Sequence, residues 1–384
     1  MKIALISDLD PSRGGGARRA QFALVIYRLR GIEAKPTPPI TRNIVVTCDV
    51  DAYLSYHENF ESLTKALVGG LACGVPKIAL LQGIPFYRDV NRRRNILRAL
   101  SLFEKYGGSY GAAYLALRRA VVLRPPSIFG KVLRLFNGVI HVSRAIPEET
   151  GIPGIVLDPG VSLPKKEIEL AMKMRAKANR RDIIYVGRPV PEKGVIEAVL
   201  AYAHIAQKTT HRLIIIAPRH FGVKAALKAA KKLGISHKVF HKTPQSRLDL
   251  LQAYATSKAL VYPSHDDSYS LIVYEALLTS TPVVAYDIPA LRLNFAQRGA
   301  TGLTLISEGD YIQLGEALLQ ALEKNTDTTP PHTTPLEKIL TQEAEIIKAL
   351  AKKNIITNTA NPYNTRNSNL EIERININQQ QGDT

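Results

Sequence analysis

The stretch Pro263-Ser264-His265-Asp266-Asp267-Ser268-Tyr269-Ser270-Leu271-Ile272-Val273-Tyr274-Glu275-Ala276-Leu277 decides the fold of the second half of the chain. An apolar run from Lys258 to Tyr262 precedes it and predicts a buried strand, and a helical pattern begins at about Ser270. A further apolar run, Thr281-Pro282-Val283-Val284-Ala285, predicts the next buried strand. Strand, polar loop, helix and strand in this order are typical of a doubly wound parallel sheet.

Two carboxylates in this stretch indicate the chemistry of its ligand. Asp267 lies in the loop and Glu275 lies in the helix. The backbone N–H groups of Ser270 and Leu271 open the helix, and an anion binds well at such a helix start. A carboxylate on either side of that anion can accept hydrogen bonds from sugar hydroxyls. A phosphate beside a hydroxyl-rich sugar describes a nucleotide-sugar.

Strands and helices alternate regularly along the second half of the chain. The predicted strands and the helices that follow them are Ile183–Gly187 with Val195–Ala206, Arg212–Ala217 with Lys224–Leu233, and Lys238–Phe240 with Arg247–Ala255. Repeats of this spacing predict a parallel sheet covered by helices. A Thr/Pro-rich linker at 326–335 leads to a last amphipathic helix, Leu336–Ala351.

The first half begins with the same kind of unit. Lys2–Ser7 predicts a buried strand, Gly14-Gly15-Gly16 predicts a loop, and a helical pattern starts at Ala17. The further predicted strands are Asn43–Cys48, Lys77–Gln82, Gly138–Ser143 and Ile155–Leu157. We therefore predict an α/β protein with two Rossmann-like domains, residues 1–165 and 166–353, whose strands end at a shared cleft. Residues 354–384 are rich in Asn, Gln and Thr and are predicted to form a disordered tail.

The second half resembles a known family. Tyr262-Pro263-Ser264, the loop and helix that follow, and Thr281-Pro282-Val283-Val284-Ala285 resemble the signature of retaining GT-B glycosyltransferases of the group 1 family. The segment Ile184-Tyr185-Val186-Gly187-Arg188-Pro189-Val190-Pro191-Glu192-Lys193-Gly194 is similar to the Gly-Arg and Glu-Lys-Gly segment of that family. The resemblance covers residues 180–305.

This resemblance implies a GT-B fold and the transfer of a hexosyl-type sugar, with retention of configuration, from a nucleotide diphosphate donor to a glycan or a lipid-linked acceptor. It implies that Arg188 and Lys193 hold the diphosphate, that Glu275 accepts from the ribose and that Asp267 contacts the transferred sugar. The two cations would stabilise the negative charge that grows on the leaving phosphate. We therefore predict Asp267, Arg188 and Lys193 as catalytic residues, and we expect neither a metal nor another cofactor.

The first domain is predicted to line the same cleft. Gly15 and Gly16 permit close approach of backbone to the donor, and Gln82 ends a strand on the acceptor side, where family members often carry a His. In this chain Asp267 replaces the glutamate of the family, and serines replace the two flanking glycines. These departures leave an alternative open, a sugar-nucleotide or polyanion-binding protein of the same fold that has lost turnover. A GT-B epimerase or phosphorylase is a further alternative.

The charge of the chain predicts anionic partners. It has 51 Lys and Arg residues against 33 Asp and Glu, a net charge of +18. Ten of the basic residues lie between Asn91 and Asn137, together with a single acid, Glu104. Amphipathic helices are predicted at Asn91–Lys105 and Ser127–Phe136, and they suggest an anionic membrane surface as a partner. The residues expected to bind it are Arg92, Arg93, Arg94 and Arg98. A solvated helix face is the alternative, and no motif for nucleic acid accompanies the charge.

Two features bear on the compartment of the protein. Met1 to Ser7 is too short for the apolar part of a secretory signal, and no apolar run is long enough to cross a membrane. Cys48 and Cys73 both lie in apolar stretches, so buried and reduced thiols are expected. We therefore expect a cytoplasmic protein, peripheral on the inner face of the membrane if the basic helices bind lipid.

Overall fold

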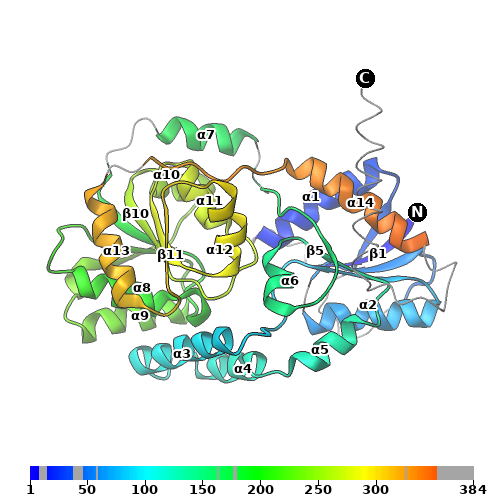
Figure 1. The fold of residues 1–384 in the computed structure, drawn as a ribbon, viewed down its shortest axis with the longest axis horizontal. Helices are drawn as coiled ribbons and strands as arrows, with labels where there is room; N and C mark the ends of the chain where they lie inside the picture. The colour runs from blue at the N-terminus through cyan, green and yellow to red at the C-terminus, as the bar shows by residue number, and fades with distance from the viewer. Residues whose placement is uncertain are drawn as a thin grey trace.

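The computed structural model describes residues 1–7, 15–37, 46–57, 59–161, 163, 165–175, 180–324 and 327–352. It contains two parallel sheets of six strands each, flanked by helices (Figure 1). This is the architecture that the sequence predicts. The predicted tail, residues 354–384, lies outside the described residues.

The first sheet is built from the first half of the chain. Its strands are β1 (Lys2–Ile6), β2 (Glu33–Thr37), β3 (Ala52–Ser55), β4 (Lys77–Leu81), β5 (Gly138–His141) and β6 (Ile155–Val156). They lie in the order β2-β1-β3-β4-β5-β6. Four helices of the same half cover this sheet, and they are α1 (Gly15–Leu29), α2 (Phe60–Cys73), α5 (Pro126–Leu133) and α6 (Ala145–Thr150).

The second sheet is built from the second half. Its strands are β7 (Asp182–Val186), β8 (Leu213–Ile216), β9 (Val239–Lys242), β10 (Ser257–Tyr262), β11 (Val283–Tyr286) and β12 (Leu303–Ile306). They lie in the order β12-β11-β10-β7-β8-β9. The helices of this half, apart from the last one, are α7 (Lys165–Arg175), α8 (Val195–Ile205), α9 (Phe221–Lys232), α10 (Arg247–Ala255), α11 (Leu271–Leu278), α12 (Pro289–Asn294) and α13 (Tyr311–Glu323).

Helices from each half of the chain pack against the domain formed by the other half. Helices α3 (Val90–Gly107) and α4 (Ala112–Val122) come from the first half, yet Leu100, Phe103 and Leu115 are buried in the core of the second domain. Helix α14 (Leu336–Lys352) ends the described chain and buries its apolar face against α1 and the first sheet. The chain passes from the first sheet to the second between β6 and β7, whereas helices from each half pack against the other domain.

The third strand differs from its prediction. Val46–Cys48, the described part of the strand predicted at Asn43–Cys48, has no regular structure, and β3 instead pairs with β1 and β4. All four residues of β3 are buried. Burial of Tyr53 and Leu54 between two neighbouring strands explains why this segment, rather than the earlier apolar run, enters the sheet.

The expectation of reduced, buried thiols is wrong. Cys48 and Cys73 form a disulfide, and Cys48 lies in an exposed segment beside the end of α2. The apolar residues next to Cys48 in the sequence therefore did not indicate that Cys48 is buried. Disulfides persist mainly in oxidising compartments and in intracellular proteins of hyperthermophiles, so the thiols no longer support a cytoplasmic location. No helix in the described part of the chain is long and apolar enough to cross a membrane.

Candidate active site

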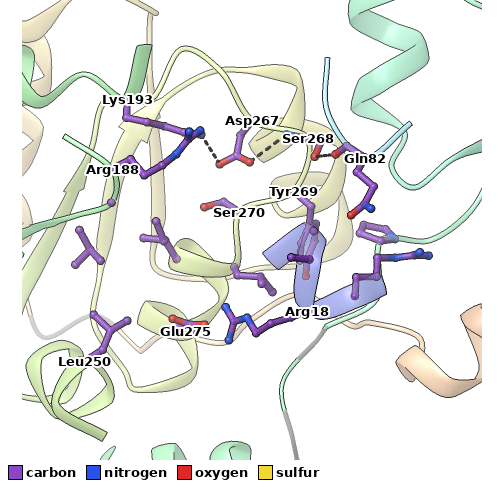
Figure 2. A pocket seen from close by; sticks show the side chains of 18 of the residues that line it. Arg18, Gln82, Arg188, Lys193, Leu250, Asp267, Ser268, Tyr269, Ser270 and Glu275 are labelled. Carbon is purple, nitrogen blue, oxygen red and sulfur yellow. Dashed lines mark hydrogen bonds and ion pairs between the residues drawn. The ribbon is translucent and has the colours of Figure 1, made fainter. Parts of the chain in front are cut away.

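A cavity of about 890 Å³ lies between the two sheets, where strands of both domains end. The predicted residues that line it are Gly16, Gln82, Arg188, Lys193, Asp267, Ser270, Leu271 and Glu275. Gly15 begins α1 next to Gly16. The structure therefore brings residues from four separate segments to one place (Figure 2).

The loop after β10 is held by its own side chains. The hydroxyl of Tyr262 donates a hydrogen bond of 2.5 Å to Oδ2 of Asp267, and the backbone N–H of Ser268 donates to Oδ1 at 3.1 Å. Burial raises the pKa of Tyr262 well above its ordinary value, so this hydroxyl remains a donor. The side chain of Ser270 caps α11 by accepting from the N–H of Val273 at 3.2 Å. The carboxylate of Asp267 is thus fixed at the cavity wall.

Two cations reach the cavity from the turn after β7. The hydroxyl of Tyr185 lies 3.0 Å from the carbonyl oxygen of Arg188 and 3.1 Å from that of Lys193, which fixes the turn. Lys193 donates to the carbonyl of Asp266, and its Nζ lies 3.5 Å from Oδ2 of Asp267. The side chain of Arg188 is exposed in the cavity, and its guanidinium makes neither a hydrogen bond nor an ion pair with any described residue.

Gly194 allows this turn to pack against the loop after β10. It has a left-handed φ of 69°, and a Cβ at this position would lie 2.0 Å from the carbonyl oxygen of Pro263. Only glycine tolerates both constraints. The glycine of the Glu-Lys-Gly segment therefore sets the distance between Lys193 and Asp267.

The carboxylate of Glu275 has a partner that the sequence did not indicate. Arg247, the first residue of α10, donates to both oxygens of Glu275, at 3.0 Å to Oε2, and to Glu167 of α7 at 2.8 Å. Burial raises the pKa of Glu275, and Arg247 and Arg18 offset part of this increase. Figure 2 shows Arg18, from the first domain, facing Glu275 across the cavity. Arg247 and Glu275 are 28 residues apart, and no local pattern connects them.

The start of α1 and the end of β4 form the opposite wall. The helix begins at Gly15, so Gly15 and Gly16 belong to its first turn and not to the predicted loop, while Gly14 lies outside the described residues. A Cβ on Gly16 would lie 2.8 Å from Oε1 of Gln82. Nε2 of Gln82 donates to the carbonyl of Tyr56 at 2.7 Å. Gly16 and Gln82 therefore fit together closely.

Hydrogen bonds join the two domains at the cavity. The hydroxyl of Ser268 donates to the backbone carbonyl of Gln82 at 2.5 Å. The carbonyl of Ser268 accepts from Ser143 at 2.6 Å and from Asn294 at 3.1 Å. A glycine at position 268 could accept hydrogen bonds at its backbone carbonyl, but it could not donate one from a side chain to Gln82. The serine that replaces the glycine of the family therefore ties the loop to the first domain.

The expectation that Arg92 binds a membrane is wrong. Its guanidinium is buried, donates to Glu149 at 2.9 Å and to the carbonyl of His265 at 2.6 Å, and forms an ion pair with Glu308. Helix α3 places this side chain against the second domain, while Arg94 and Arg98 on the same helix are exposed. Arg92 therefore connects three segments inside the protein.

His265 is also structural and does not line the cavity. It is fully buried, with Nε2 2.6 Å from Glu197 and Nδ1 2.7 Å from Glu308. Burial alone would lower the pKa of His265, but the two carboxylates raise it to about 9. Both ring nitrogens of the charged form can donate, so the imidazolium holds the two carboxylates together.

Stability should depend on pH through His265. The pKa of His265 is raised in the folded state from its ordinary value of 6.5. Its contribution to the free energy of unfolding is therefore complete below pH 6.5 and is lost as the pH rises through about 9. We expect the difference in unfolding free energy between the native protein and His265→Gln to shrink over this range. Urea unfolding at several pH values measures it. A difference that stays constant from pH 6 to about 10 would show that His265 is not charged in the fold.

In the described residues, no group of three or more His, Cys, Asp and Glu side chains could hold a metal ion.

Comparisons with known proteins find similarity to glycosyltransferases. Residues 167–334 match the family described as "Glycosyl transferases group 1". The D-inositol 3-phosphate glycosyltransferase of Nocardia farcinica is 33% identical over 128 residues, which cover 32% of this chain and 28% of that protein. The enzyme of the same name from Mycobacterium marinum is 28% identical over 193 residues, covering 49% and 40%. The aligned part of the chain spans less than half the length of these relatives.

Solved structures share the whole fold at low sequence identity. HepE from Anabaena, in complex with UDP and glucose, has a TM-score of 0.53 and 14% identity, with 92% of this chain and 98% of that chain covered. Sucrose-phosphate synthase from Thermosynechococcus elongatus has a TM-score of 0.54 and 17% identity, with 92% and 97% covered. Residues 167–334 are therefore similar to the group 1 glycosyltransferases, and the chain shares its fold with these solved structures.

Proposed function

We propose that the protein transfers a hexosyl-type sugar from a nucleotide diphosphate donor to an acceptor, with retention of configuration. One observation carries this proposal. Arg188, Lys193, Asp267 and Glu275 of the second domain line a single cavity, and Gln82 of the first domain lies on its other side. Two cations, a helix start and two carboxylates are the groups that a diphosphate joined to two sugars requires.

The donor would occupy the wall formed by the second domain. Its diphosphate would contact Arg188, Lys193 and the N–H groups of Ser270 and Leu271, where the exposed guanidinium of Arg188 is available to it. Glu275 would accept from the ribose. Each carboxylate oxygen has two lone pairs, so Glu275 can accept hydroxyls while Arg247 occupies one side.

The reaction would break the bond between the anomeric carbon and the leaving phosphate oxygen. The acceptor hydroxyl would form its bond to that carbon on the same face, and its proton would pass to the donor phosphate oxygen. Gln82 cannot take this proton. We therefore propose that the phosphate oxygen of the donor takes it. Lys193 and Arg188 would stabilise the charge on the phosphate as the bond breaks, so they bind the transition state more strongly than the ground state.

The acceptor is inferred to carry hydroxyls and an anionic group, as a polyol phosphate or a phosphate-linked glycan does. The curated relatives are named for D-inositol 3-phosphate. In this chain Arg18 lines the cavity from the first domain, and its Nε lacks a hydrogen-bond partner among the described residues. A cation in this position favours an acceptor with negative charge.

A binding protein without turnover is the second candidate. The contact between Ser268 and Gln82 favours it, because it holds the two domains together at the cavity. A fixed closed cleft would slow the exchange of substrate and product. Release of nucleotide diphosphate from a donor sugar distinguishes the two candidates, since only an enzyme produces it.

Two conservative substitutions test the placement of the donor. We expect Glu275→Gln to weaken the affinity for nucleotide diphosphate by about tenfold or more, because a charge-assisted hydrogen bond contributes about 1.5–3 kcal/mol. Asp267→Asn should leave this affinity unchanged and slow turnover instead, because Asp267 would contact the transferred sugar. Calorimetric titration gives the affinities and product formation gives the rates. If Asp267→Asn weakens nucleotide binding and Glu275→Gln does not, the donor binds in the opposite orientation, with its nucleotide at Asp267 and its transferred sugar at Glu275.

A further inference from the structure

The most exposed residues of α4 are apolar. Every residue of this helix that is exposed is alanine or leucine, and these residues are Ala112, Ala113, Ala116, Leu117 and Ala120. Leu117 is 62% exposed. A helix on the surface of a soluble protein normally turns polar residues outward. Helix α4 therefore lacks the polar residues that are expected at its exposed positions.

The apolar surface continues beyond α4. Leu123, which caps the helix, is 60% exposed, and Ile128 and Leu135 in and after α5 are 53% and 57% exposed. Phe60 of α2 is 52% exposed, and its ring lies 6.3 Å from that of Phe129 of α5. We call the exposed leucines and isoleucine of α4, α5 and their flanks the α4–α5 face. Extended apolar surface of this kind marks an interaction site.

The charge of this segment has one sign. Residues 105–147 contain seven Lys and Arg residues and no Asp or Glu. Arg118 and Arg119 are paired with carboxylates of other segments. Lys131 and Arg134 are exposed and make no ion pair with a described residue. Unpaired cations therefore accompany the leucines.

The α4–α5 face lies along one edge of the molecule. Figure 1 shows α3, α4 and α5 in a row on the edge opposite α1 and α14, below both domains. Leu115 of α4 is buried in the core of the second domain, and Phe129 and Leu133 of α5 are buried in that of the first. The row is therefore anchored in both domains.

We infer that the α4–α5 face binds an anionic lipid surface. Leucines enter the boundary between headgroups and acyl chains, while lysines and arginines contact the lipid phosphates. The site shares the helix at Ser127–Phe136 with the one expected from the sequence, and it differs because Arg92 is buried and the exposed leucines of α4 take part. A second copy of the chain fits this face less well, since a twofold contact would oppose cations to cations.

Vesicle sedimentation with the full chain tests this inference. At low salt the protein should bind vesicles that contain phosphatidylglycerol and should not bind pure phosphatidylcholine vesicles. Binding should weaken as salt rises, because the charges are screened. Leu117→Glu combined with Leu123→Glu should lower the binding about tenfold or more. Lys131→Gln combined with Arg134→Gln should weaken it and reduce its dependence on salt.

A matched control separates the face from a general effect of added charge. Val25 and Leu29 of α1 are 60% and 74% exposed and lie on the opposite edge. Changing both to Glu should leave vesicle binding intact, and all variants should keep the thermal stability of the parent protein.

Three results would overturn the inference. The first is that the parent protein does not bind anionic vesicles at low salt. The second is that the α1 control loses as much vesicle binding as the Leu117→Glu and Leu123→Glu variant. The third is that vesicle binding is absent and sedimentation velocity shows a dimer, which Leu117→Glu combined with Leu123→Glu dissociates. The last result would assign the face to a second copy of the chain.

Discussion

We expect Lys193→Ala and Arg188→Ala each to lower kcat by about 30- to 1,000-fold at saturating donor. This corresponds to about 2–4 kcal/mol, the effect of removing one preorganised charged contact from a developing anion. Both cations line the cavity, and Lys193 is already positioned by the carbonyl of Asp266 and by Asp267. Steady-state rates of nucleotide diphosphate release measure the effect.

Lys231→Ala is the matched control for this prediction. Lys231 is exposed on α9 and does not line the cavity, so its removal should leave the rate unchanged. Rates equal to that of the parent protein in both Lys193→Ala and Arg188→Ala would show that the diphosphate is not held by these residues. Unfolding transitions of the variants should match that of the parent, which excludes loss of fold as the cause.

Arg92→Ala should lower the stability of the protein by about 3–5 kcal/mol, because removing one partner of a buried ion pair leaves its carboxylates uncompensated. Glu149 and Glu308 are the carboxylates concerned. Arg94→Ala on the same helix is the control, and an exposed change of this kind should alter stability by less than about 0.5 kcal/mol. Urea unfolding followed by circular dichroism measures both. Equal midpoints for the two variants would contradict the structural role of Arg92.

The parts of the fold that the sequence predicts are those determined by local pattern. The strand before Pro263, the loop and α11 follow from an apolar run, a polar loop and a helix start within about twenty residues. Asp267 and Glu275 were singled out for the same reason, and both line the cavity. Local pattern is sufficient here because each of these residues occupies a fixed position relative to one strand end.

The features that the sequence did not predict depend on contacts between distant segments. Helical periodicity showed which residues share a face of α3, but not that the second domain covers Arg92. Arg247 could not be paired with Glu275 before α10 and α11 were seen together. Leu117 and its neighbours in α4 have the composition of a buried helix, and only the structure places them at the surface.

The most direct test of the account is the product of donor hydrolysis without acceptor. The purified protein is incubated with a panel of nucleotide diphosphate hexoses, and proton NMR records the released sugar at early times, before its anomers equilibrate. We predict slow release of nucleotide diphosphate from at least one donor, with the sugar first appearing in the anomeric configuration of that donor. First appearance of the opposite anomer would contradict retention, and absence of release with every donor would contradict the assignment as an enzyme.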